Sequence, residues 1–174
     1  MRALVVFESM FGNTEQVARA IAVGIAETMD VQVVGVSGAE VPADGAPLLV
    51  VGAPTHAFSL SRPLTRADAN RQGAHSDPDL GLREWLERLG AGRHAEVAAA
   101  FDTRFRQGRH LPGSAARKAA KVLRHKGYRV AACESFYVED TAGPLVVGEL
   151  ARATAWGRGL ASRLPESSQG QPVA

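Results

Sequence analysis

The N-terminal stretch contains the feature that most constrains the fold, an apolar run that breaks into a polar loop and continues as an amphipathic segment. Residues 3–7, Ala-Leu-Val-Val-Phe, are continuously apolar, as in a short buried strand. From Asn13 onward, apolar residues recur at helical spacing, with Val17 and Ile21 on one stripe. We expect Asn13 to cap this helix, with Gln16 three residues later as in a capping box. The chain is therefore predicted to begin as strand, loop and helix.

The loop between this strand and helix has the composition of an anion site without a cation. It precedes a helix N-terminus, where unpaired backbone N–H groups and the helix dipole favour a phosphate. Ser9 and Thr14 supply hydroxyls, Asn13 supplies an amide, and no Lys or Arg occurs between residues 8 and 18. The loop is not a Walker loop, since no Lys-Ser/Thr pair follows Gly12, and its single glycine does not make a GxGxxG fingerprint. Neutral donors to a charged group contribute about 1.5–3 kcal/mol each, so several suffice.

The window from residue 5 to residue 21 resembles the flavodoxin signature. The positions that this signature constrains are all filled by residues of the expected kind, namely Val5, Val6, Phe7, Ser9, Gly12, Thr14, Ala18 and Ile21. In flavodoxins this loop holds the phosphate of FMN. The resemblance therefore implies that the FMN phosphate is bound by Ser9, Met10, Phe11, Gly12, Asn13 and Thr14.

The rest of the chain alternates short apolar runs with helical patterns. Further strands are expected at 31–36, 48–52, 96–101 and 128–134, and further helices at 82–89, 114–126 and 145–164. Residues 37–47 are too few for a full crossover helix, and Ser59 to Asp79 reads as a long polar loop. The alternation predicts an α/β fold with a parallel sheet covered on both faces. The resemblance implies a flavodoxin-like, three-layer, doubly wound sheet of five strands in the order 2-1-3-4-5.

Two further loops follow strands at the carboxyl edge of this sheet, where doubly wound folds bind ligands. The resemblance implies that they enclose the isoalloxazine ring, through Pro54, Thr55, His56, Ala57 and Phe58 after the third strand and Asp102, Thr103, Arg104 and Phe105 after the fourth. A flat ring needs aromatic or apolar walls, which His56, Phe58 and Phe105 offer, and Asp102 offers an acceptor for ring N–H groups. The Trp and Tyr that flank the ring in well-known flavodoxins are missing from these loops. Arginine-rich segments, 62–71 and 104–109, replace the acidic surface of those carriers.

Composition narrows the class of protein. The chain of 174 residues is 45% apolar, enough for one core, so we expect one domain over 1–164 and a disordered tail over 165–174. The net charge is only +2, and the one cysteine, Cys133, excludes a disulfide within the chain and a cysteine-based metal site. We expect no nucleic-acid or membrane partner and, since neither a signal peptide nor an apolar span is evident, a cytoplasmic location.

Three functions fit these patterns. The first is an FMN-binding electron carrier served by a redox partner protein, either a reductase or an acceptor. The second is an FMN-dependent NAD(P)H:quinone-type oxidoreductase of the same fold, in which the arginines of 62–71 meet the phosphates of the nicotinamide cofactor. The third is a flavin-free interaction module. The sequence favours the carrier over a stand-alone enzyme, and either a monomer or a homodimer is compatible with it.

Overall fold

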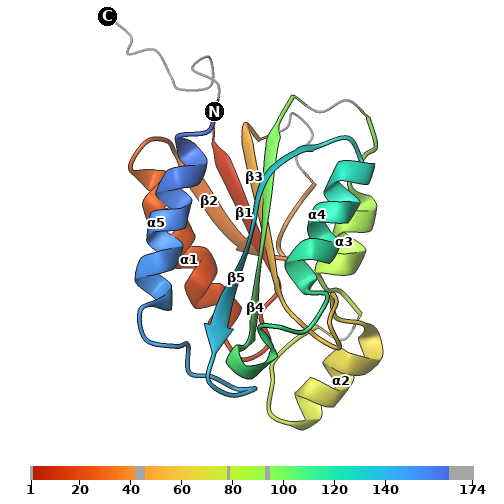
Figure 1. Ribbon diagram of the computed structural model, residues 1–174. Helices are drawn as coiled ribbons and strands as arrows, with labels where there is room; N and C mark the ends of the chain where they lie inside the picture. The colour runs from red at the N-terminus through yellow and green to blue at the C-terminus, as the bar shows by residue number, and fades with distance from the viewer. Residues whose placement is uncertain (1, 42–45, 78, 93–94, 165–174) are drawn as a thin grey trace, which may run out of the picture.

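Five apolar segments form a parallel sheet that is covered by helices on both faces (Figure 1). The computed structural model describes residues 2–41, 46–77, 79–92 and 95–164. The strands are β1 Ala3–Phe7, β2 Val31–Gly35, β3 Leu48–Pro54, β4 Val97–Phe105 and β5 Arg129–Val138. The helices are α1 Asn13–Ala26, α2 Pro63–Arg71, α3 Leu82–Arg88, α4 Ala115–His125 and α5 Glu149–Ala161, with a short 3₁₀ turn, η1, at Arg106–Gly108.

The strand order is β2-β1-β3-β4-β5, and every neighbouring pair is parallel, as expected. The order reverses between β1 and β3, which pair with Val5 opposite Val50. At such a reversal the loops that follow the two strands leave toward opposite faces of the sheet, and a crevice opens between them. The fold class is therefore the doubly wound one, and its crevice lies where the first polar loop leaves β1.

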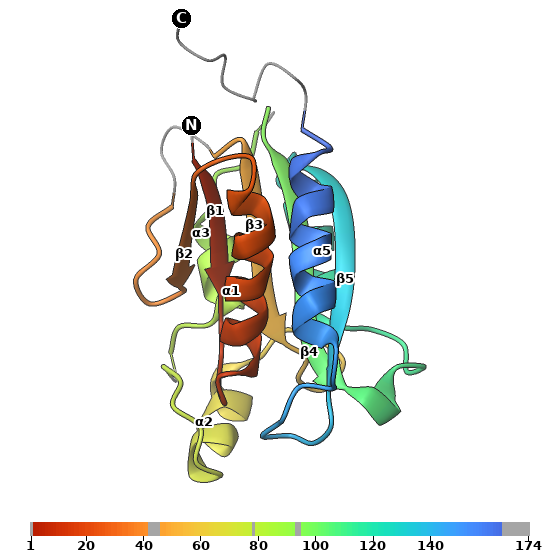
Figure 2. The same ribbon diagram turned by 90° about the vertical axis from the view of Figure 1, so that its left-hand side faces the viewer.

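Side chains of the strands alternate between two cores. Val5, Val50 and Ala99 face α1 and α5, whereas Val6, Val51 and Ala100 face α3 and α4. Figure 2 shows α1 and α5 lying side by side over one face. Because both faces are buried, the strands are apolar throughout rather than alternating with polar residues.

Glycines let α1 and α5 approach backbone to backbone. A β-carbon at Gly24 would lie 2.0 Å from the carbonyl oxygen of Thr154, and one at Gly157 would lie 2.1 Å from the carbonyl oxygen of Ile21. No side chain fits in either place, so these two positions fix the distance between the helices.

The connection from β2 to β3 has no helix within its described residues, 36–41 and 46–47, as the sequence indicated. Trp85 of α3 is fully buried and belongs to the same apolar core as Val36, the first residue of this connection. Its indole Nε1 donates to the carbonyl oxygen of Ala39 at 2.9 Å. This hydrogen bond ties the connection to α3.

Several expected boundaries were wrong. The long loop expected over 59–79 contains α2, which begins at Pro63 with the Thr65 hydroxyl accepting from the Arg62 N–H at 2.8 Å. β4 and β5 run on to Phe105 and Val138, because their pairing continues past the apolar runs that marked them. The last helix begins at Glu149 rather than near residue 145. Ser114 does cap α4, accepting from the Arg117 N–H, as expected.

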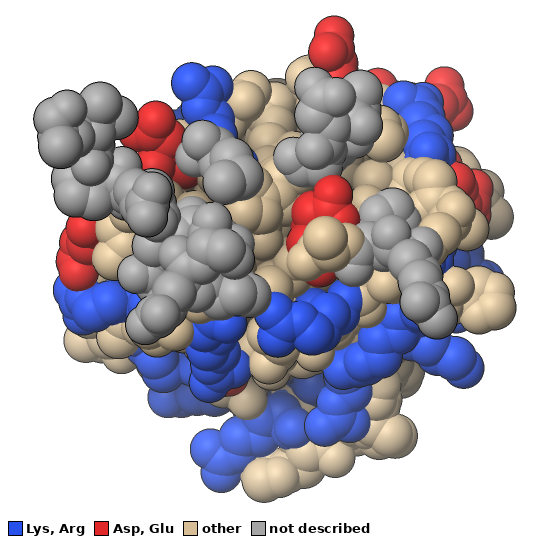
Figure 3. All heavy atoms as spheres, turned by 90° about the horizontal axis from the view of Figure 1, so that it is seen from above, with Lys and Arg blue, Asp and Glu red and all other residues tan. Residues whose placement is uncertain are grey.

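β1 begins and α5 ends at the end of the molecule opposite the carboxyl ends of the strands (Figure 1). The tail expected to be disordered, 165–174, lies outside the described residues. Basic side chains gather on one side of this end of the molecule (Figure 3). No helix among the described residues is both long and apolar enough to span a bilayer.

Candidate functional site

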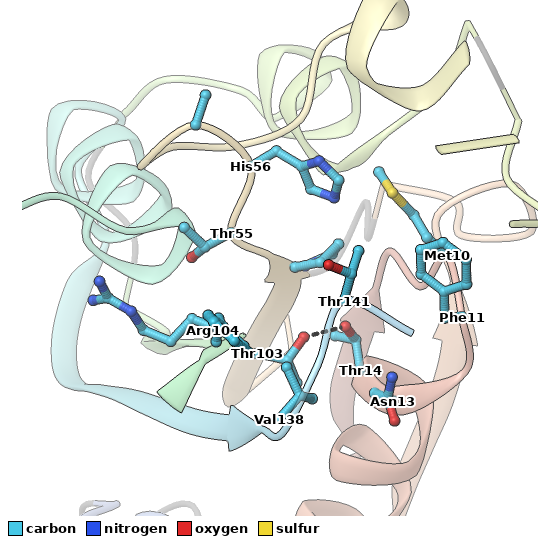
Figure 4. A pocket seen from close by; sticks show the side chains of 13 residues that line it. Met10, Phe11, Asn13, Thr14, Thr55, His56, Thr103, Arg104, Val138 and Thr141 are labelled. Carbon is cyan, nitrogen blue, oxygen red and sulfur yellow. Dashed lines mark hydrogen bonds between the residues drawn. The ribbon is translucent and has the colours of Figure 1, made fainter. Parts of the chain in front are cut away.

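A cavity of about 210 Å³ opens at the carboxyl ends of β1, β3 and β4. It is lined by eleven of the fifteen residues expected to bind the cofactor, together with two others: Met10, Phe11, Asn13, Thr14, Pro54, Thr55, His56, Ala57, Thr103, Arg104, Phe105, Val138 and Thr141. The three polar loops singled out in the sequence therefore meet at one place. Figure 4 shows their side chains converging from opposite sides of the cavity.

The first loop presents a row of unpaired backbone donors. Within the described chain, the N–H groups of residues 10–14 have no hydrogen-bond acceptor, and the next N–H, of Glu15, donates to the Ser9 hydroxyl at 3.3 Å. These donors precede or open α1, a helix of 14 residues, so the helix dipole adds to them. The arrangement is that of an anion site built from backbone groups.

Asn13 does not cap α1 as the sequence suggested. The capping position belongs to Gly12, whose φ of 86° lies in the left-handed region that glycine adopts without strain. The Asn13 amide instead donates to the carbonyl oxygen of Ala142 at 3.1 Å. This bond ties the first loop to the segment after β5, which sequence reasoning did not connect with the site.

The floor of the cavity is closed by a buried contact between two threonines. The hydroxyl oxygens of Thr14 and Thr103 lie 2.7 Å apart, and both residues are buried (Figure 4). Because Thr14 opens α1 and Thr103 lies in β4, this bond fixes the first loop against the fourth strand.

The loop after β3 is a tight, strained turn. His56 and Ser59 exchange two backbone hydrogen bonds of 2.9 Å, and between them Ala57 and Phe58 have φ values of 45° and 62°. Positive φ is costly for residues other than glycine, so the turn holds a geometry that its sequence disfavours. His56 points into the cavity, whereas Phe58 is 53% exposed and does not line it.

The surroundings of His56 favour the neutral form of its imidazole. Burial, and then the positive charge of Arg66, lower the pKa of His56 below its ordinary value of 6.5. We predict that an NMR titration of the His56 ring will show this lowered pKa. A histidine with a lowered pKa stabilises the fold above the ordinary value of 6.5, and this contribution is lost as the pH falls through the folded-state pKa.

In the wild-type protein, the free energy of unfolding should decrease as the pH falls just below 6.5. In the variant His56→Gln, this decrease should be smaller. An unchanged pH profile in the variant, or a His56 ring whose pKa is not below 6.5, would contradict the prediction.

Four of the expected site residues lie outside this cavity, and Asp102 has a different role. Its side chain is fully buried under α4, where one carboxylate oxygen accepts from the Ala116 N–H at 2.8 Å. Asp102 therefore anchors a helix and does not face the space that a ring would occupy. The sequence did not indicate this role because the contact joins Asp102 to the start of α4, 14 residues further along the chain. Ser9 and Gly12 line a neighbouring cavity with Glu15, Gly73 and His75.

Arg104 lines the cavity, but its guanidinium is already engaged. Nη2 donates to the carbonyl oxygens of Gly108 at 2.5 Å and Leu111 at 3.2 Å, and the residue is buried. In Figure 4 the guanidinium points away from Thr14 and His56. The charge of Arg104 thus organises the turn after β4.

Solved structures of the same architecture are numerous. An archaeal flavodoxin aligns with 94% of this chain and 98% of its own length, at a TM-score of 0.65 and 21% identity. The flavodoxin of Streptococcus pneumoniae aligns with 94% of this chain and 100% of its own, at 0.65 and 16%. A flavone reductase aligns with 93% of this chain and 62% of its own, at 0.57 and 16%. This chain has the flavodoxin-like fold. No protein-family model matches the sequence, and no curated protein is significantly similar to it.

In this flavodoxin-like chain, a buried polar network that the sequence did not reveal supports the site. Glu8, the residue before the first loop, accepts from the Ser61 hydroxyl at 2.5 Å and from the Leu82 N–H at 2.8 Å. Arg66 is fully buried, donates to the same Ser61 hydroxyl at 2.8 Å and lies 3.2 Å from Glu84. The network joins the end of β1 to α2 and α3.

Burial raises the pKa of Glu8 despite these bonds. Gly81 lies against the network, since a β-carbon there would be 2.4 Å from Nη1 of Arg66 and 2.8 Å from Glu8 Oε2.

Arg66 was expected within a long polar loop, but it lies in α2 and is fully buried. The sequence does contain a signal for this burial. Arg66 and Ala69 are spaced as on one face of a helix, although the segment was predicted to be a polar loop.

Val138 and Thr141, after β5, complete the cavity of this flavodoxin-like chain. Neither residue carries a sequence signal for a cofactor. They reach the site because Asn13 binds Ala142 and because β4 and β5 pair in register to their ends, with Phe105 opposite Val138. Among the described residues no cluster of potential metal ligands occurs.

Proposed function

We propose that this chain binds FMN without a covalent bond and transfers electrons through it. The observation that carries the proposal is the row of five consecutive backbone N–H groups, residues 10–14, that lack an acceptor within the described chain. A phosphate monoester supplies acceptor oxygens and a negative charge at the place where the helix dipole favours both. That the solved flavodoxins share the fold supports the same assignment.

The remaining walls suit a flat ring system. Phe11, Pro54, Phe105 and Val138 offer apolar or aromatic surface, and the neutral imidazole of His56 adds a polar edge. The bound flavin would supply one- or two-electron chemistry, while the residues of this chain hold and orient it. The Thr14–Thr103 bond fixes the phosphate loop and the ring loop of β4 relative to each other.

Titration of the purified protein with FMN and with riboflavin tests the proposal. FMN should bind with a change in its visible absorbance, and riboflavin, which lacks the phosphate, should bind at least about tenfold more weakly, since each hydrogen bond to a charged group contributes about 1.5–3 kcal/mol. Equal affinities would show that the first loop does not hold a phosphate. If neither compound binds, the result would favour the third function considered above, a flavin-free interaction module.

We predict that Gly12→Ala weakens FMN binding by roughly 5- to 30-fold. Alanine in the left-handed region costs about 1–2 kcal/mol, and the loop relieves this strain by turning its peptide groups away from the phosphate. Gly148→Ala is the matched control, because Gly148 also caps a helix, has a φ of 90° and has nothing within 4 Å of an added β-carbon. Both variants should lose similar stability in urea, and only Gly12→Ala should lose affinity for FMN.

A second candidate is an FMN-dependent NAD(P)H:quinone-type oxidoreductase. It is favoured by an additional cavity beside α2, which is lined by Phe11, His56, Thr65, Asp68, Ala69, Gln72 and Thr141. The arginines expected to meet the nicotinamide phosphates support it less, because Arg66 is buried and Arg71 pairs with Asp68. Steady-state oxidation of NAD(P)H by the FMN-loaded protein with a quinone present separates the two candidates. A carrier would show no such turnover without a separate reductase.

We further propose that the carrier works with a redox partner protein in the cytoplasm, as a monomer or a homodimer, without nucleic acid or membrane partners. We interpret the exposed face of α4 as a helix surface in contact with solvent. Its basic residues are Arg117, Lys118, Lys121 and Arg124.

A further inference from the structure

Glu8 is a buried carboxyl group beside the first loop, and the binding described above does not use it. It is 2% exposed and immediately precedes Ser9, where the loop begins. No Lys or Arg occurs between residues 8 and 18, so the loop itself has no cation that would offset the charge of a bound phosphate. The nearby buried charges therefore decide how much that phosphate is repelled.

The network around Glu8 has two carboxyl groups and one guanidinium. Arg66 of α2 is fully buried, donates to the Ser61 hydroxyl at 2.8 Å and lies 3.2 Å from Glu84 of α3. Burial opposes the ionisation of Glu84, but hydrogen bonds from the Gly81 N–H and from Arg66 lower its pKa, so Glu84 keeps its charge. The network therefore has one excess negative charge when Glu8 is ionised and is neutral when Glu8 is protonated.

The hydrogen bonds of Glu8 accommodate either protonation state. As a carboxylate, Glu8 accepts from the Ser61 hydroxyl at 2.5 Å and from the Leu82 N–H at 2.8 Å. When protonated on Oε1, it can donate to the Ser61 oxygen instead, because a hydroxyl rotates and has two acceptor lone pairs. Arg66 uses one of these lone pairs, and the other accepts the proton of Glu8. Protonation of Glu8 therefore breaks no contact.

A cavity of about 100 Å³ at the carboxyl ends of β1 and β2 joins Glu8 to the surface. Its lining includes Glu8, Ser9, His75 and Asp77. Because His75 and Asp77 are exposed, the cavity offers a path by which water exchanges a proton with Glu8. Together with the network, these two residues complete the charged and titratable groups that face Glu8 from the described chain.

We propose that Glu8 takes up a proton from solvent when a phosphate binds to the first loop, so that binding of the ligand and binding of the proton are coupled. The phosphate and an ionised Glu8 repel each other more strongly in a buried region than in water, where the dielectric constant is higher. Protonation of Glu8 removes this repulsion, and by linkage each binding event favours the other. This role rests on the proposed function, in which residues 10–14 hold a phosphate.

Titration with FMN at several pH values tests the coupling, with Glu8→Gln as the variant that imitates the protonated acid. At about pH 8 the variant should bind FMN at least about threefold more tightly than the wild-type protein, because it lacks the repelling charge. This difference should shrink toward equality at about pH 5, where the wild-type carboxyl group gains its proton. The ionisation of the phosphate is common to both proteins and cancels in the comparison. A purely structural Glu8 would instead make the variant bind equally well or more weakly at every pH, which would overturn the proposal.

His75→Gln is the matched control, because His75 also titrates and lines both the cavity of Glu8 and a space beside the first loop. Its side chain is exposed, so salt and water screen its charge, and the variant should keep the wild-type affinity within about twofold at each pH. Loss of the pH dependence in this variant rather than in Glu8→Gln would assign the proton to His75 and overturn the proposal.

¹³C NMR of the Glu8 carboxyl group in the wild-type protein gives a second measurement, which does not depend on the stability of a variant. FMN and inorganic sulfate, a dianion that does not titrate in this range, should each move the Glu8 titration to higher pH, whereas riboflavin should not. An unmoved titration, or an equal shift with riboflavin, would overturn the proposal. If sulfate moves the titration while FMN does not bind, only the proposed function fails. Failure of both anions to bind at the first loop would overturn both.

Discussion

Replacing Gly157 by alanine is expected to lower the free energy of unfolding by about 3 kcal/mol. The added β-carbon would lie 2.1 Å from the carbonyl oxygen and 3.1 Å from the Cα of Ile21, both of which are backbone atoms of α1. Neither atom can rotate away as a side chain could, so α1 and α5 must separate and the core between them must loosen. Urea denaturation followed by circular dichroism measures the loss.

Gly159→Ala is the control for this prediction. Gly159 lies in the same helix, and nothing is found within 4 Å of an added β-carbon there. Alanine at that position should stabilise the protein by about 0.5–1 kcal/mol, because it is the better helix former. Equal effects of the two substitutions would mean that the close approach of α1 and α5 does not limit packing.

Removing the Glu8 carboxylate should also cost about 3 kcal/mol of stability. Glu8→Ala leaves the Leu82 N–H without its acceptor and the fully buried Arg66 guanidinium with less negative charge around it. Breaking a buried charge network by removing one partner typically costs 3–5 kcal/mol, and Glu84 retains one contact with Arg66, which places the expected loss at the low end. Chemical denaturation at neutral pH measures it.

Glu15→Ala provides the comparison, because Glu15 forms an exposed i,i+4 pair with Arg19 at 2.7 Å. Exposed pairs of this kind contribute about 0.3–0.5 kcal/mol, so the variant should be nearly neutral. A loss for Glu8→Ala as small as that for Glu15→Ala would show that the buried network does not stabilise the fold.

The pH dependence of Glu8 gives a second readout. Burial raises the pKa of Glu8 above its ordinary value of 4.5, so its folded form binds a proton more readily than its unfolded form. The part of the stability that comes from protonation of Glu8 in the folded state is therefore full below pH 4.5 and is lost as the pH rises through the folded-state pKa, while the hydrogen bonds of the carboxylate remain. Comparison with Glu8→Gln, which does not titrate, should show this decline only in the wild-type protein.

Local pattern was enough to predict a parallel sheet covered on both faces, while the strand order came from the family resemblance. Buried parallel strands must be apolar on both faces, so runs such as residues 3–7 and 48–52 were recognisable without any knowledge of their neighbours. The helix predicted at 114–126 agrees with α4, which has the capping hydroxyl of Ser114 at one end and the left-handed Gly127 just past the other, because a helix satisfies its terminal groups with nearby residues. These features depend on residues close together in the chain.

The direction in which each side chain of the site points could not be predicted from the sequence. Asp102 was expected to accept from a ring, whereas in the structure its carboxylate accepts from the Ala116 N–H at the start of α4. Phe58 was expected as a wall, but the strained turn at Ala57 and Phe58 exposes it. A shift of one residue in a strand or turn reverses the face of a side chain, which local pattern does not resolve.

The sequence by itself determined the strand–loop–helix unit whose loop, Ser9 to Thr14, presents unpaired N–H groups, because a helix N-terminus always leaves such donors. Only the tertiary structure decided what surrounds that loop. Two contacts between residues far apart in the chain hold its neighbours in place. Glu8 with Ser61 fixes the segment before α2 against the loop, and Thr14 with Thr103 fixes β4 against it. These contacts join residues 53 and 89 positions apart, and no periodicity or local propensity encodes separations of that size.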